Sequence, residues 1–250
     1  MPHDSNGFQR TMLLTGASRG IGHATVKLFY QHGWRVLTVS RAPFTDDCPW
    51  PGGRESHVQA DLSDPASHQT LADNVRERLG GSGLSAIVNN AAISPKLAGG
   101  QRMGVADTVF EDWLTVFNVN LFAAAALSRL FLPELKATRG AVVNVTSIAG
   151  SRVHPFAGTA YACSKAALAA LTREQAFDFG RFGIRVNAIA PGEIDTSILS
   201  AGTEHIVSQQ IPMHRLGDPA EVAQVVLFLC SGDASYVNGA EIHVNGGQHV

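Results

Sequence analysis

Residues 15–22 of this chain read TGASRGIG, and they stand between an apolar run at residues 12–15 and a helical pattern at residues 21–32. Glycines let the backbone of such a turn come close to a ligand, and the start of a helix offers unpaired N–H groups and a favourable dipole. The glycine spacing is G-x-x-x-G-x-G, and a plain tight turn is the alternative interpretation. The position between strand and helix favours a nucleotide pyrophosphate site. Its candidate residues are Gly16, Ser18, Arg19, Gly20, Ile21 and Gly22.

The strand–helix order of this stretch continues along the whole sequence. Short apolar runs that do not alternate with polar residues are typical of strands buried on both faces of a sheet. Their alternation with helices predicts an α/β fold, a single-domain, doubly wound Rossmann fold with a parallel seven-stranded sheet. We expect residues 1–250 to form one domain, with residues 1–10 as a flexible N-terminus. The expected strands are 12–15, 35–40, 57–60, 86–89, 141–146, 184–189 and 241–244, and the expected helices are 21–32, 65–79, 109–136, 158–181 and 219–230.

Residues 41–56 interrupt this order. Three prolines and two neighbouring glycines stand there, where a crossover helix would be expected. Proline fixes φ and removes a backbone donor, so the segment is predicted to be a loop.

Composition excludes several classes of protein. Hydrophobic residues make up 45% of the 250 residues and charged residues 16%, which excludes a disordered tail. The formal net charge of −2 gives no basis for bulk electrostatic binding to nucleic acid or to an anionic membrane. No run of 18 apolar residues predicts a membrane span. Three widely spaced cysteines and no zinc motif predict neither a disulfide framework nor a metal site, so we expect a cytoplasmic protein.

The end of the second expected strand should meet the ribose of a bound dinucleotide. A carboxylate there would bind the ribose hydroxyls of NAD, but this chain has Ser40 and Arg41 and no acid before Asp46. Arg19 in the glycine turn adds a second guanidinium, and the arginine fork suits phosphate geometry, so NADP(H) is favoured. One alternative is NAD(H), with Ser40 accepting the ribose and Arg41 stacking on adenine. Another is that both arginines are solvated surface charges.

Tyr161 and Lys165 stand four residues apart in the sequence YACSK. If residues 158–181 are helical, both side chains lie on one helix face, where the ammonium can act on the phenol. A tyrosine with an unperturbed pKa of about 10 is a poor base at neutral pH. A nearby cation favours the phenolate and moves it toward the acid–base range. The pair alone is a weak signal, because tyrosine and lysine share helix faces by chance.

Other motifs surround this pair in a fixed order. Ser147 follows an apolar strand, Asn120 lies in an Asn-Val-Asn sequence, the fourth strand ends in NNAA at 89–92, and the sixth ends in PG at 191–192 with Thr196 beyond. With these motifs the chain resembles a classical short-chain dehydrogenase/reductase over essentially its full length. It is similar to the 3-oxoacyl-carrier-protein reductase-like and the sugar or secondary-alcohol dehydrogenase-like branches of that family.

The resemblance implies an NAD(P)-dependent enzyme, acting as a carbonyl reductase or an alcohol dehydrogenase. Tyr161 would be the general acid/base, and Lys165 would lower its pKa and bind the nicotinamide ribose. Ser147 would hold the substrate oxygen, and Asn120 would position a water in the proton relay. The nicotinamide itself supplies the hydride chemistry. The resemblance further implies cofactor contacts from Asp61, Leu62, Asn89, Ala91, Pro191, Gly192, Ile194 and Thr196.

The substrate is the least readable part of the sequence. Glu193 stands where the family often has an apolar residue, and His154 lies between Ser147 and Tyr161, where the resemblance expects a pocket wall. Both indicate a small polar hydroxyl or keto substrate. A structural role is the alternative for each. Residues 94–109 form a longer segment than is usual in the family, with three glycines. They indicate either a mobile loop beside the pocket or a surface insertion.

The resemblance also implies a homo-oligomer, as a tetramer or a dimer, built through the helices at 109–136 and 158–181. A non-catalytic nucleotide-binding scaffold is the remaining alternative. The complete set of Asn120, Ser147, Tyr161 and Lys165 argues against it, because a scaffold has no evident need for a tuned phenol.

Overall fold

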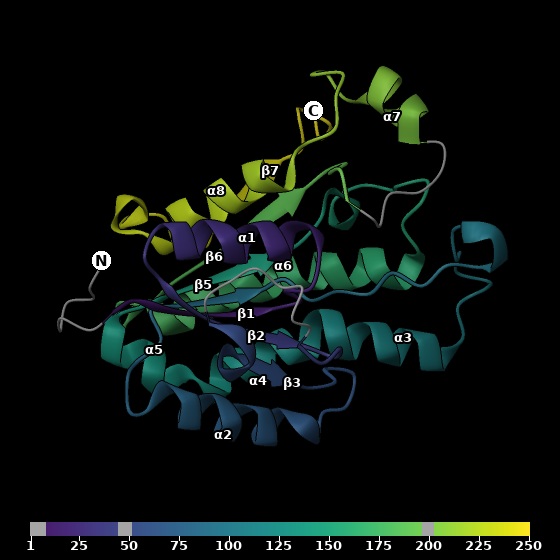
Figure 1. Cartoon of the computed structure of the whole chain (residues 1–250). Coiled ribbons are helices and arrows are strands. Elements are labelled where there is room, and N and C mark those ends of the chain that lie inside the picture. Colours follow the sequence, from purple (N-terminus) through teal and green to yellow (C-terminus); the bar gives the residue numbers. More distant parts are fainter. Residues whose placement is uncertain (1–8, 45–51, 197–202) are drawn as a thin grey trace.

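The computed structural model describes residues 9–44, 52–196 and 203–250, which form a parallel sheet flanked by helices (Figure 1). The strands stand in the order β3-β2-β1-β4-β5-β6-β7, and each neighbouring pair is parallel. This confirms the α/β Rossmann fold with a seven-stranded parallel sheet. The strands are β1 (Thr11–Thr15), β2 (Arg35–Ser40), β3 (His57–Gln59), β4 (Ala86–Asn89), β5 (Ala141–Val145), β6 (Arg185–Pro191) and β7 (Glu241–Val244).

Helices cover both faces of this sheet (Figure 1). They are α1 (Gly20–Gln31), α2 (Ser67–Leu79), α3 (Phe110–Phe117), α4 (Ala123–Leu130), α5 (Leu132–Thr138), α6 (Thr159–Gly180), α7 (Thr203–Gln210) and α8 (Pro219–Cys230).

One face of the sheet is covered by α1 and α8, which pack against each other. Val26 and Phe29 of α1 and Val226 of α8 form a cluster with Met12 and Leu14 of β1, and all five are fully buried. Alternate residues of a strand point to opposite faces, so Leu13 leaves this cluster for the other side.

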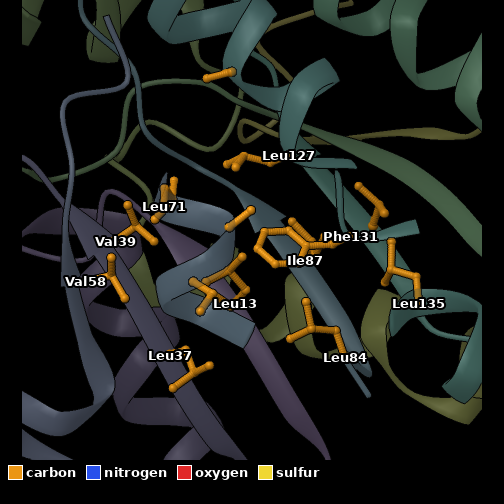
Figure 2. Close-up of a cluster of buried hydrophobic side chains, with 14 of the residues drawn as sticks. Leu13, Leu37, Val39, Val58, Leu71, Leu84, Ile87, Leu127, Phe131 and Leu135 are labelled. Carbon is orange, nitrogen blue, oxygen red and sulfur yellow. The ribbon is translucent and has the colours of Figure 1, made fainter. Parts of the chain in front are cut away.

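The opposite face is covered by α2, α4 and α6, and Figure 2 shows its core. Leu13 and Ile87 from neighbouring strands meet Leu71 of α2, Leu127 of α4 and Phe131 just beyond it. Burial of each such side chain contributes about 1.5–3 kcal/mol to stability. The two clusters hold the strand ends in fixed register, and that register positions the loops that follow them.

The stretch predicted as one helix at 109–136 is three helices, with a π-helical turn at Asn118–Phe122 between α3 and α4. The hydrophobic pattern does not reveal such a turn, because it inserts one residue without changing the apolar composition. In the part of the chain that the structure describes, one helical run is long and apolar enough to cross a membrane, and it is Phe110–Leu130. One side of this run packs against α2 and α6 and buries Asn118 and Asn120, while Phe110, Leu114 and Phe122 are exposed.

Two further differences concern the loops. Within the segment predicted to be a loop at 41–56, Gly53–Ser56 forms a 3-10 turn, and residues 45–51 lie outside the described residues. The helix α7 was not predicted, because its eight residues carry no strong apolar stripe. Residues 1–8 of the predicted flexible N-terminus also lie outside the described residues.

Candidate active site

The predicted residues gather at the carboxyl ends of the strands, around a cavity of about 850 Å³. The cavity is lined from β1 and β2 on one side and from β4, β5 and β6 on the other. The strand order reverses between β1 and β4, and ligands of open α/β sheets bind at this switch point. The volume is also in the usual range of small-molecule sites.

The turn after β1 depends on close contact between backbones. Gly16 has a φ of +74°, and a Cβ there would lie 2.8 Å from the Cα of Ala91. A Cβ on Gly22 would lie 2.1 Å from the Gly16 carbonyl oxygen. Asn90 fixes the turn, because its Nδ2 donates to the carbonyl oxygens of Thr15 at 3.1 Å and Gly16 at 2.9 Å. A side chain at either glycine would therefore displace the turn.

The start of α1 is suited to an anion. Its first turn has neither a side-chain cap nor an acidic residue, and Gly20, Ile21 and Gly22 line the cavity. The unpaired N–H groups and the positive end of the helix dipole face that space. This donor set fits the pyrophosphate of a dinucleotide.

The far end of the cavity is lined by Ser40, Arg41 and Asp61. Asp61 accepts hydrogen bonds from the Ser63 N–H at 2.9 Å and the Ser63 hydroxyl at 2.8 Å. These bonds, and more weakly the charge of Arg41, hold the pKa of the Asp61 carboxyl below its usual value. The side chains of Arg19 and Arg41 are both exposed, and both residues line the cavity.

Tyr161 and Lys165 enter the cavity from α6, as their spacing predicted. The Lys165 Nζ lies 5.7 Å from the centre of the Tyr161 ring and donates to the Val145 carbonyl oxygen at 2.6 Å. Lys165 is 2% exposed and, among the described residues, has no carboxylate partner. Burial lowers the pKa of its ammonium to about 7.

Burial is also the largest influence on the pKa of the Tyr161 phenol. It raises the pKa of Tyr161, a hydrogen bond with the Ser147 side chain opposes this, and the negative charge of Glu193 adds to the rise. The pKa of this phenol is therefore raised, and not lowered as expected from Lys165. Ser147 Oγ also accepts the Ala149 N–H at 3.2 Å, which holds the hydroxyl beside the phenol.

Asn120 lies in the π-helical turn and is 2% exposed. Its Oδ1 accepts the Ile93 N–H at 2.8 Å, while its Nδ2 donates to the Ile93 carbonyl at 3.0 Å and to Ser164 Oγ at 3.0 Å. Both ends of this amide are engaged, so the side chain ties the segment after β4 to α6. The predicted water contact stays a prediction.

A buried polar network anchors α6 to the sheet. Asn144 of β5 accepts from Asn89 Nδ2 at 2.8 Å, and its own Nδ2 donates to Thr172 Oγ1 at 2.9 Å and Gln175 Oε1 at 3.0 Å. Asn89 is thus turned into the sheet and is not among the residues that line the large cavity, so its predicted adenosine contact stays a prediction. Its neighbour Asn90 lines the cavity instead.

The remaining wall carries Glu193 and His154, as predicted. The His154 Nε2 and Glu193 Oε1 atoms lie 2.5 Å apart. The long segment at 94–109 contributes Ser94, Pro95 and Lys96 to the same wall, so it borders the pocket rather than forming a distant insertion. Its C-terminal part is held by the Arg102 Nε, which donates to the Ala157 carbonyl at 2.9 Å.

Apart from Asn89 and Asn120, every predicted site residue lines the cavity. Sequence reasoning missed Asn90, Ser94 and Lys96. The Asn-Asn pair at 89–90 gave a signal for the first of these, although the sequence does not show which amide faces the turn. The segment at 94–109 was a candidate for a loop beside the pocket, but nothing in it singled out Lys96, because the position of that side chain follows from the path of the loop.

Comparison with known proteins identifies the family. The family model described as enoyl-(acyl carrier protein) reductase matches residues 16–249. FixR of Bradyrhizobium diazoefficiens is 55% identical over 245 residues, which cover 98% of this chain and 88% of that protein. The meso-2,3-butanediol dehydrogenase of Serratia marcescens is 33% identical over 245 residues, covering 95% of this chain and 94% of that enzyme.

A solved structure agrees with this match. A short-chain dehydrogenase/reductase from Brucella ovis, in complex with a partially ordered NAD, has a TM-score of 0.83 and 55% identity, covering 95% of this chain and all of that one. The matches extend over nearly the whole chain and include the glycine turn and the Tyr161–Lys165 pair. They exclude the scaffold alternative. The chain therefore belongs to the short-chain dehydrogenase/reductase family, and it is an NAD(P)-dependent oxidoreductase.

Proposed function

We propose that this enzyme uses NADP(H) to interconvert a small carbonyl compound and a secondary alcohol, with Tyr161 as the general acid/base. The observation that carries the proposal is the cluster of Tyr161, Ser147 and Lys165 in one cavity with the uncapped start of α1. The cofactor would lie along the glycine turn, and a substrate would occupy the part of the cavity beside Ser147.

The bound nicotinamide supplies or accepts the hydride. For reduction, the protonated phenol of Tyr161 donates its proton to the substrate oxygen, while the Ser147 hydroxyl donates a hydrogen bond to the same oxygen. For oxidation, the Tyr161 phenolate takes that proton. The Lys165 ammonium stabilises the phenolate, which is the form that burial disfavours. Asn120 and the anchoring network of α6 keep these groups in place.

Replacement of Tyr161 by Phe tests the assignment. We expect turnover to fall by about 10²- to 10⁴-fold, because the proton donor is lost. The affinity for the cofactor should change little. Tyr236→Phe is the matched control, since Tyr236 is fully exposed and lies outside the cavity. Turnover preserved in Tyr161→Phe contradicts the proposal.

The preference for NADP(H) rests on Arg19 and Arg41. Both line the cavity and would offer guanidinium groups to a 2′-phosphate, and Asp61, a carboxylate that lines the same cavity, is already bonded to Ser63. The NAD in the related Brucella ovis structure supports NAD(H) as the second candidate. Fluorescence titration with NADPH and NADH compares the two directly, and tighter binding of NADH contradicts the preference.

We also infer a cytoplasmic homo-oligomer, a tetramer or a dimer, with no nucleic-acid or membrane partner. The helices predicted to join subunits expose large apolar side chains. Phe110 of α3 is 73% exposed and Phe177 of α6 is 84% exposed. Contact with a second copy of the chain would remove this apolar surface from water.

A further inference from the structure

Four residues from three loops form a hydrogen-bonded series across the substrate end of the cavity. Lys96 Nζ donates to the Phe156 carbonyl oxygen, the Phe156 N–H donates to His154 Nδ1 at 3.3 Å, and His154 Nε2 lies 2.5 Å from Glu193 Oε1. The proposed proton and hydride transfers use none of these side chains. The proposed function therefore does not explain why these side chains are bonded to one another.

The direction of the hydrogen bonds fixes the tautomer of His154. The Phe156 N–H can only donate, so His154 Nδ1 is an acceptor and its proton is on Nε2. That proton is donated to Oε1 of Glu193. The Glu193 side chain is about 10% exposed, and its second oxygen, Oε2, accepts no hydrogen bond from the residues that the structure describes. The result is a carboxylate held in one orientation with one oxygen available to the cavity.

The position of this carboxylate relates it to the reacting atoms. Glu193 lines the same cavity as Tyr161 and Ser147, and it is close enough to Tyr161 for its charge to act on the phenol. A substrate oxygen bound between Tyr161 and Ser147 would place the neighbouring carbon of the substrate near this wall. A hydroxyl on that carbon could donate to Oε2.

We propose that Glu193 selects vicinal diols and α-hydroxy ketones, by accepting a hydrogen bond from the second hydroxyl of the substrate. This inference rests on the proposed function and names its substrate class. In the oxidation, the carbinol C–H leaves as hydride to the nicotinamide, the adjacent O–H proton passes to Tyr161, and a C=O bond forms. The second hydroxyl is unchanged. His154 and Lys96 are positioning residues, because they act through the orientation of Glu193.

Other substrate classes fit this wall less well. A simple alcohol would cover the carboxylate without giving it a donor, and an unpaired polar group in a closed site is costly. An anionic substrate would meet the like charge of Glu193. A cationic substrate would meet the Lys96 ammonium, which lies on the same wall.

The test compares butane-2,3-diol with butan-2-ol, which share the reacting carbon and differ in one hydroxyl. With saturating cofactor, the wild-type kcat/KM should be about 10- to 100-fold higher for the diol. Glu193→Leu should reduce this ratio to about one by lowering the value for the diol. Asp195→Asn, a nearby exposed carboxylate that does not line the cavity, should leave the ratio unchanged.

The positioning role of His154 has its own readout. His154→Phe removes the donor to Glu193 and should lower the diol preference, whereas His154→Gln can still donate an amide N–H and should restore part of it. General damage to the fold would lower both substrates together and leave the ratio unmoved. An unchanged ratio in both Glu193→Leu and His154→Phe overturns the inference.

Two further substrates separate the charge classes. 2-Hydroxypropanoate carries a carboxylate in place of the second carbinol and its methyl group, and 3-aminobutan-2-ol carries an ammonium in place of the second hydroxyl. Both should be poorer than the diol, and higher kcat/KM for either one overturns the neutral class. Equal turnover of butan-2-ol and the diol overturns the inference alone. No turnover of any of the four, by protein that binds cofactor, overturns the proposed function as well.

Discussion

Burial is the main influence on the pKa of the Lys165 ammonium. Lysine side chains usually keep their charge, but this one is enclosed by the ends of β5 and α6 and donates to a carbonyl oxygen rather than a carboxylate. Its pKa of about 7 lies well below the ordinary 10.5. The charge that favours the Tyr161 phenolate is therefore itself sensitive to pH near neutrality.

This shift predicts a dependence of stability on pH. Since the folded pKa is about 7 and the unfolded one about 10.5, the unfolded chain binds more protons between these values. The free energy of unfolding should therefore rise with pH across this window, by up to about 5 kcal/mol at 1.36 kcal/mol per pH unit. Thermal unfolding of the wild type and of Lys165→Met at pH 7 and pH 9.5 measures this change in the free energy of unfolding. The wild type should gain stability relative to the variant, and parallel behaviour of the two proteins would contradict the buried ammonium.

Arg41 carries the prediction on cofactor choice. Arg41→Ala should weaken binding of NADPH by about 10- to 100-fold, because a charged hydrogen bond to the 2′-phosphate is lost. Binding of NADH should change by less than about threefold. The titration is run at low and high salt, since screening should reduce the effect. Arg173→Ala, exposed on α6 and outside the cavity, is the control. Equal losses for both cofactors would remove Arg41 from the phosphate site.

At the scale of elements, the turn between β1 and α1 depends on the absence of a side chain at Gly16. A Cβ there would meet the Ala91 backbone at 2.8 Å, in addition to the strain of a positive φ. Gly80 ends α2 with a φ of +57°, and a Cβ on it would have no neighbouring atom within 4 Å, so it isolates the strain alone. The two glycines form a matched pair.

We expect Gly80→Ala to cost about 1 kcal/mol of stability, as a left-handed conformation does for alanine. Gly16→Ala should cost more, and it should also weaken cofactor binding by at least about tenfold, because the turn moves away from the pyrophosphate. Denaturant unfolding and cofactor titration of both variants give the comparison. Similar losses of stability and of cofactor affinity in Gly16→Ala and Gly80→Ala would show that contact with Ala91 does not constrain the turn.

Most of the helices and strands could be predicted from the sequence, whereas several contacts of the site could not. Apolar runs located all the strands and the major helices, because burial on both faces requires continuous hydrophobic residues. The π-helical turn around Asn120 left no such pattern, since one inserted residue changes direction without changing composition. Glu193 and His154 were placed in the pocket by resemblance, but their mutual contact and the role of Lys96 depend on the paths of three loops. The sequence does not show that Asn90 rather than Asn89 faces the glycine turn, because successive side chains of an extended segment point to opposite sides.

For the whole molecule, the exposed apolar side chains of α3 and α6 predict the subunit interface. Replacement of both Phe110 and Phe177 by Asp should lower the mass measured by sedimentation velocity, because a charge in an apolar contact opposes association. Tyr236 is fully exposed just before β7, and Tyr236→Asp tests that second surface. If that variant lowers the mass and the double variant does not, the interface runs along β7 instead.

The packing of α1 against α8 has a consequence for synthesis. These helices are about 200 residues apart in the chain, yet each covers the apolar face of the other above β1. At about 5–20 residues per second, a ribosome needs about 10 to 40 seconds to make the intervening chain. Throughout that time Val26 and Phe29 lack the part of their cluster that α8 supplies, including Val226. The half that contains the glycine turn is thus made first but completed last, and its exposed apolar helix is a natural target for chaperones during translation.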